Sequence, residues 1–73
     1  MATQIVMDHT GDSRHCFDAD DTNALLKAEE RFNALTSAGF TAAVRDTAGV
    51  TTVTRSFDPT AKETLFYPRL VGG

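Results

Sequence analysis

The clearest periodicity in the chain predicts one amphipathic helix at about residues 22–38. Leu25, Ala28, Phe32 and Leu35 recur at steps of three and four residues, which places them on one helical face. The preceding segment 18–22 is rich in Asp and Thr, whose side chains accept hydrogen bonds from the first-turn N–H groups of a helix. Gly39 follows the last apolar position and is expected to end the helix.

β-Branched and alternating residues predict strands on both sides of this helix. The expected strands are residues 4–8, 13–18, 41–46, 50–57 and 64–67. Gly11 lies between the first two strands and supplies the positive φ that a tight hairpin needs. Asp58 and Pro59 begin a turn before the last strand. The resulting order of elements is β-β-α-β-β-β.

This order predicts an α+β fold in which one helix packs across a β-sheet and shares a single core with it. The expected core residues are Ile5, Phe17, Leu25, Phe32, Leu35, Val44, Val53 and Phe66. A chain of 73 residues makes one small domain. We assign residues 1–68 to this domain and expect residues 69–73 to form a flexible C-terminal tail.

Composition narrows the function classes. The net charge is −3 and the chain has no run of Lys or Arg, which argues against nucleic-acid binding. The single cysteine, Cys16, excludes an internal disulfide and favours a reducing compartment. No apolar run approaches the length of a membrane span, and the first residues lack a signal peptide. We therefore expect a soluble cytoplasmic protein that binds no membrane.

Candidate catalytic and metal-binding residues gather in the first hairpin, but their spacing is unfavourable. His9, His15 and Cys16 are metal-ligand types, yet His15 and Cys16 are neighbours on a strand and point to opposite faces. No paired Cys-x-x-Cys supports a zinc site. Asp12, Ser13 and His15 are also too close in sequence to form a catalytic triad. The sequence predicts neither a metal site nor an enzyme.

The last two residues, Gly72 and Gly73, carry the most specific chemical signal. A pair of glycines adds nothing to a packed core, but it lets a narrow channel of another protein close around the backbone. The carboxylate of Gly73 would then be available for adenylation, thioester transfer or conversion to a thiocarboxylate. A frayed chain end without function is the alternative interpretation.

The whole chain resembles a ubiquitin-like β-grasp protein. Three matches carry the resemblance: Gln4-Ile5-Val6 leading into Thr10-Gly11, the helix start Asp20-Asp21-Thr22, and Thr64-Leu65 continuing to Arg69-Leu70-Val71-Gly72-Gly73. Their order and spacing agree over nearly the full length. The resemblance implies a mixed sheet in which the last strand lies centrally, beside and parallel to the first.

The sequence departs from ubiquitin in two ways. It has only two lysines, Lys27 and Lys62, which puts chain building through lysine in doubt. Phe66-Tyr67-Pro68 is closer to the sulfur carriers of molybdopterin synthesis, whose tails read Phe-Pro-Pro before small residues and Gly-Gly. The tail is therefore compatible with both a protein modifier and a sulfur donor.

The resemblance implies a protein modifier of the kind found in bacterial conjugation operons, which is a substrate rather than an enzyme. An activating enzyme would adenylate Gly73 with ATP and Mg²⁺, a carrier enzyme would receive the glycyl group, and a deconjugating metalloprotease would remove the modifier. Conjugation would use Gly72 and Gly73. The partner enzymes would recognise the tail through Arg69, Leu70 and Val71. The sheet face opposite the helix would dock partners, with His9, Thr10, Val44 and Tyr67 as candidates. A sulfur carrier with a C-terminal thiocarboxylate and a small non-catalytic interaction domain are the alternatives.

Overall fold

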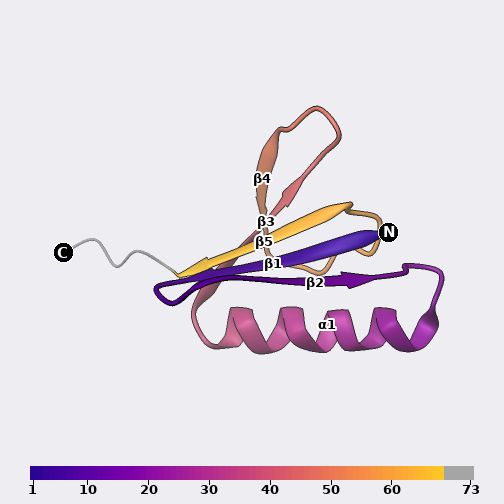
Figure 1. Cartoon of the computed structure of the whole chain (residues 1–73), viewed down its shortest axis with the longest axis horizontal. Coiled ribbons are helices and arrows are strands. Elements are labelled where there is room, and N and C mark those ends of the chain that lie inside the picture. The colour runs from indigo at the N-terminus through magenta and orange to yellow at the C-terminus, as the bar shows by residue number, and fades with distance from the viewer. Residues whose placement is uncertain (69–73) are drawn as a thin grey trace.

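A computed structural model describes residues 1–68, which form five strands and one helix in the predicted order (Figure 1). The elements are β1 (Ala2–Asp8), β2 (Gly11–Phe17), α1 (Thr22–Ser37), β3 (Phe40–Arg45), β4 (Thr51–Thr54) and β5 (Glu63–Pro68). The α+β fold class and the single helix across the sheet are confirmed. Residues 69–73, on which the predicted tail falls, lie outside the described residues.

The strands form one mixed sheet in the order β2-β1-β5-β3-β4. β1 and β5 are parallel, with Ile5 beside Leu65, and every other neighbouring pair is antiparallel. The expected central position of the last strand is confirmed, and the topology is consistent with a β-grasp fold. Helix α1 covers one face of the sheet, while the β3–β4 hairpin rises on the opposite side (Figure 1).

Helix α1 begins and ends at the residues that the sequence marks. The Asp21 carboxylate caps it by accepting hydrogen bonds from the backbone N–H groups of Asn23 and Ala24, at 3.0 and 3.3 Å. After Ala38 the chain turns at Gly39, whose φ of +99° is a conformation that side chains other than glycine rarely adopt. This turn delivers the chain directly into β3.

Three phenylalanines form the centre of the core between α1 and the sheet. Phe32 of α1 meets Phe66 of β5 and Phe57 edge-on, with ring centroids 5.7 and 5.9 Å apart. Such tilted contacts align the positive ring edge with the negative ring face. Phe57 also reaches Phe17, at 6.5 Å, and so links the two ends of the core beneath the helix.

Strand β4 corrects two predictions. The strand ends at Thr54, not at residue 57, because the Thr54 hydroxyl donates to the carbonyl of Ser56 and bends the chain away from β3. Val53 was expected in the core but is 61% exposed. It pairs with Ala43 at the sheet edge, on the side away from α1, where no further element covers it. Phe57, which the longer strand would have included, turns into the core instead.

The other predicted core residues lie inside to different degrees. Phe17, Phe32 and Phe66 are buried beneath α1, whereas Leu25, Leu35 and Val44 are half-buried. Ile5 is buried too, but it is beside Leu65 on the sheet face away from α1, so its predicted place in the helix-side core is wrong. No helix within residues 1–68 is long and apolar enough to cross a membrane.

Truncating Phe32 tests the position of the core. Phe32→Ala removes a ring that is 1% exposed and contacts two other phenylalanines, so it should lower the free energy of unfolding by about 3–5 kcal/mol. Urea denaturation measures the loss. Leu26→Ala, at a helix position that is 53% exposed, is the matched control and should change the midpoint little. Equal midpoints for the two variants would contradict this helix orientation.

Candidate functional site

The hairpin tip and the end of β5 lie at the same end of the sheet. Because β1 and β5 run parallel with Val6 beside Phe66, β1 reaches its turn where β5 reaches Pro68 (Figure 1). Strand β3 starts at this end too, since Phe40 pairs with Pro68. We call His9, Thr10, Tyr67 and Pro68 the β5-end surface. It groups three of the predicted docking residues beside the point from which residues 69–73 continue.

The hairpin tip is held by a carboxylate. The Oδ1 atom of Asp8 accepts hydrogen bonds from the Thr10 hydroxyl and the Thr10 backbone N–H, the latter at 2.8 Å. These two bonds, the hydroxyl first, lower the pKa of Asp8 because they stabilise its charged form. Gly11 closes the turn at a φ of +127°, as the sequence predicts. His9 is exposed at this tip.

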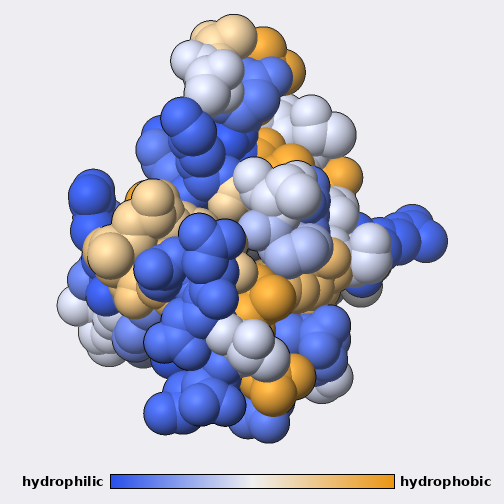
Figure 2. Space-filling view, turned by 90° about the vertical axis from the view of Figure 1, so that its right-hand side faces the viewer, coloured by the Kyte–Doolittle hydropathy of each residue, from blue (hydrophilic) through white to orange (hydrophobic). Residues whose placement is uncertain are grey.

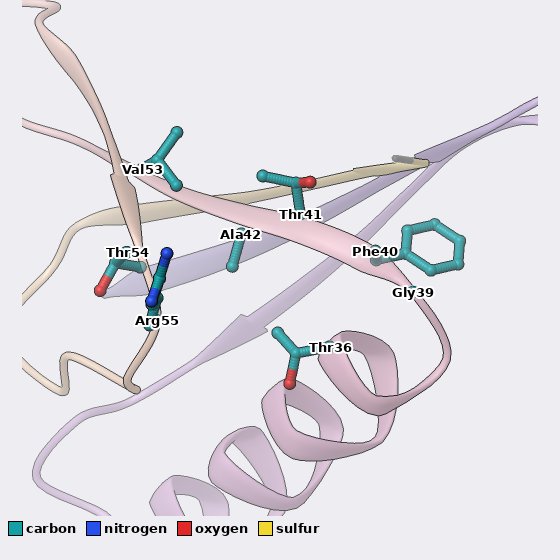
Figure 3. A pocket seen from close by; sticks show the side chains of 8 residues that line it. All are labelled: Thr36, Gly39, Phe40, Thr41, Ala42, Val53, Thr54 and Arg55. Atoms are coloured by element: carbon teal, nitrogen blue, oxygen red, sulfur yellow. The ribbon is translucent and has the colours of Figure 1, made fainter. Parts of the chain in front are cut away.

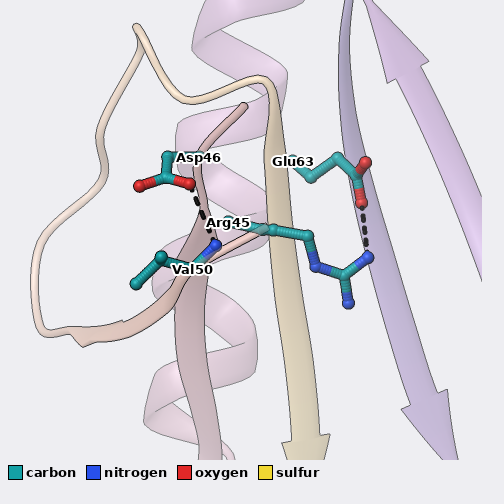
Figure 4. A network of polar contacts seen from close by, with 4 residues as sticks. All are labelled: Arg45, Asp46, Val50 and Glu63. Carbon is teal, nitrogen blue, oxygen red and sulfur yellow. Dashed lines mark hydrogen bonds and ion pairs between the residues drawn. The ribbon is translucent and has the colours of Figure 1, made fainter. Parts of the chain in front are cut away.

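The open sheet face, on the side away from α1, has an apolar centre. Ile5, Leu65 and Ala43 lie side by side across β1, β5 and β3, and each is at most 7% exposed. Met7 and Tyr67 alternate in phase with them and are half-buried. Toward the far end of the sheet the face becomes polar, where Arg45 and Glu63 form an ion pair at 3.3 Å (Figure 4).

Sequence reasoning missed Ile5, Met7 and Leu65 as residues of this face. The signal that could have found them is the pair of runs Ile5-Val6-Met7 and Leu65-Phe66-Tyr67, which are apolar at successive positions. A strand with both alternating sets apolar is typical of one that is covered or used on both faces.

Val44 and Tyr67 lie on opposite sides of the sheet. Val44 pairs with Thr64, which shares the helix side with Phe66, whereas Tyr67 is in phase with Leu65 on the open face. The structure therefore brings Tyr67 together with the hairpin tip and leaves Val44 apart from them. The predicted tail residues, Arg69, Leu70, Val71, Gly72 and Gly73, lie outside the described residues.

A groove of about 440 Å³ lies between the C-terminal end of α1 and strands β3 and β4 (Figure 3). Its walls are Thr36, Gly39, Phe40, Thr41, Ala42, Val53, Thr54 and Arg55. Arg55 is its only titratable side chain, so the groove has no acid–base pair. Among residues 1–68, no three His, Cys, Asp or Glu side chains are grouped so that they could hold a metal ion.

The end of the molecule at which β1 begins offers less for binding. Seen from that end, the surface is largely hydrophilic, and its apolar areas are small and separate (Figure 2). The β5-end surface, where His9, Thr10 and Pro68 are exposed, is the candidate docking site.

No protein-family model, curated protein or solved structure gives a significant match to the chain. The assignment of function therefore depends on the topology and on the residues themselves.

The hairpin tip gives a pH-dependent prediction. Thr10→Val removes the hydroxyl donor but keeps the backbone donor, so the pKa of Asp8 should rise part of the way to its usual range. Since the folded-state pKa is lowered, the contact stabilises the turn above the usual pKa and is lost as the pH falls through the lowered one. A carboxyl-carbon NMR titration measures the change.

Asp58 provides an internal control for this titration. The hydroxyl and backbone N–H of Thr60 lower its pKa in the same way, at a turn far along the chain. Its pKa should be identical in wild type and Thr10→Val. An unchanged Asp8 pKa in the variant would show that the hydroxyl bond does not form in solution.

Proposed function

We propose that this protein is a ubiquitin-like modifier whose Gly73 carboxylate is activated by a partner enzyme and joined to a target. The observation that carries the proposal is the place of β5. It is the central strand, parallel to β1, and it leads directly into Arg69-Leu70-Val71-Gly72-Gly73. Strand β1 pairs with it as far as Phe66 and β3 as far as Pro68, so the sheet holds β5 up to its last residue.

The proposed chemistry takes place on this chain's carboxylate and in the partners' active sites. The Gly73 carboxylate attacks the α-phosphorus of ATP, which the activating enzyme binds with Mg²⁺; pyrophosphate leaves and a glycyl adenylate forms. A cysteine thiolate of that enzyme displaces AMP, and a carrier-enzyme cysteine takes over the thioester. A target amine then displaces the thiolate and loses a proton, which leaves an amide. A deconjugating metalloprotease hydrolyses this amide and releases the modifier with a free Gly73 carboxylate.

The residues around the β5 end suit recognition by such enzymes. Gly72 and Gly73 have no Cβ, so a narrow channel can enclose them, while Arg69, Leu70 and Val71 offer side chains just before it. His9, Thr10 and Tyr67 provide a polar and aromatic surface beside the same end of the sheet. In this proposal the β5-end surface, together with half-buried Met7 on the open face, docks the body of the partner.

A sulfur carrier is the second candidate, and Phe66-Tyr67-Pro68 favours it. In that case a hydrosulfide ion, rather than a cysteine thiolate, attacks the glycyl carbonyl of the adenylate; AMP leaves, a proton is lost and a C-terminal thiocarboxylate remains. Both candidates require Gly73 to carry a free carboxylate, either directly or after a longer precursor is cut there.

Changes at Gly72 and Gly73 should abolish activation without unfolding the protein. Deletion of both glycines, or Gly73→Ala, should eliminate ATP–pyrophosphate exchange with the cognate activating enzyme. The deletion leaves the terminal carboxylate on branched Val71, two residues short, and Gly73→Ala adds a Cβ in the channel. The free energy of unfolding should stay unchanged. Leu26→Ala is a surface control that should exchange normally. Adduct formation by the deletion variant would eliminate both candidates and leave a non-catalytic interaction domain, for which changes at Val44 or Tyr67 should matter instead.

Intact mass spectrometry of the protein from its native host separates the two candidates. A covalent adduct with another protein supports the modifier. A mass gain equal to the difference between sulfur and oxygen supports the sulfur carrier. The same spectrum shows whether Gly73 is the terminal residue.

A further inference from the structure

The sheet has two edge strands, β2 and β4, and they differ in charge. β2 carries Asp12 and Arg14, both exposed, and charged side chains on an edge discourage pairing with another strand. β4 reads Thr51-Thr52-Val53-Thr54 and has no charged side chain. The edge formed by β4 therefore lacks the protection that β2 has.

The hydrogen-bond pattern between β3 and β4 shows which backbone groups of β4 point away from the sheet. Asp46 donates its N–H to the carbonyl of Val50 at 3.0 Å, and bonded and non-bonded pairs alternate along an antiparallel ladder. Thr52 and Thr54 therefore direct their N–H and C=O groups toward β3. Thr51 and Val53 direct theirs outward, where no backbone group within residues 1–68 pairs with them.

Apolar exposure gathers at the same edge. Val53 is 61% exposed and Val50, just before the strand, is 56% exposed. The β3–β4 hairpin stands away from the rest of the sheet (Figure 1), and the groove of Figure 3 separates β4 from the end of α1. Another strand can thus approach β4 without meeting the helix.

We propose that β4 is a self-association surface, on which two copies of this chain pair antiparallel about a two-fold axis through Thr52. In this register Thr51 of each copy lies opposite the partner's Val53, and the two exchange both backbone hydrogen bonds. The two sheets become one continuous sheet with both helices on the same face. The contact is isologous, so it closes at the dimer.

Charge and side-chain pairing favour a second copy as the occupant. The register sets exposed Val50 beside the partner's Thr54, so that each valine gains a methyl neighbour. It also sets the partner's Arg55 opposite Gly49, in the turn where the Asp46 carboxylate accepts the N–H groups of Ala48 and Val50, both at 2.9 Å (Figure 4). The Arg55 side chain of one copy therefore comes next to a turn that carries a carboxylate in the other. So short a strand gives a small interface and a weak dimer.

A charge exchange at Thr52 tests both the surface and the register. Thr52 is exposed and would lie opposite its own copy on the two-fold axis, with Cβ atoms about 4.5–5.5 Å apart. Thr52→Lys and Thr52→Asp each place like charges there and should weaken self-association about tenfold or more. An equimolar mixture of the two variants should associate again, because unlike charges then meet. Sedimentation equilibrium at protein concentrations up to millimolar measures the association of the wild type, of each variant and of the mixture.

The matched control lies on the other edge. Ser13→Lys adds the same charge at an exposed position of β2 and should leave self-association unchanged. A wild type that stays monomeric at millimolar concentration overturns the proposal, as does Thr52→Lys protein that associates like wild type. Failure of the mixture to associate rules out this register. Loss of association in Ser13→Lys moves the interface to β2 and overturns the proposal as well.

Discussion

The parallel pairing of β1 with β5 is the contact on which the rest of the sheet depends. Parallel neighbours cannot be joined by a tight turn, so the chain has to leave β1 and return along the same direction. Every other element lies on that return path, with β2 added outside β1 and with β3 and β4 outside β5. The central strand consequently faces two environments. Phe66 enters the core beneath α1, while Leu65 joins Ile5 and Ala43 on the face that no helix covers.

One buried polar side chain fixes how the helix lies on this frame. Gln4 of β1 is fully buried, yet both ends of its amide are paired. Its Nε2 donates to the carbonyl of Ala28 at 3.0 Å, and its Oε1 accepts from the Arg31 guanidinium at 2.8 Å. A buried amide costs free energy unless such partners are in place, so the network penalises any sliding or rotation of α1 over β1. Aromatic packing around Phe32 supplies apolar burial, and the Gln4 network adds a fixed helix position.

The sequence predicts those features that have a local cause. The helix follows from its apolar period and the Asp21 cap, and the first turn follows from Gly11. Strand order came only from the resemblance to a family, because pairing between residues some sixty positions apart leaves no local pattern. The error at Val53 has the same origin, since an alternating strand looks alike at a sheet edge and at its centre. Val44 and Tyr67 lie on opposite faces of the sheet because neighbouring positions on a strand alternate between faces. An error of one residue in the assumed register therefore moves a side chain to the other face. For Gly72 and Gly73, residue type alone supports the candidate site.

The late position of β5 in the chain has a consequence for how the protein is made. Until residues 63–68 have left the ribosome, the β1–β2 and β3–β4 hairpins do not pair with each other. The strand that lies between them in the sheet, β5, is still missing. An isolated hairpin is marginally stable at best, and its unpaired edges invite wrong partners. The nascent chain should therefore remain unfolded, and open to chaperones and proteases, until β5 emerges and both halves of the sheet close on it together.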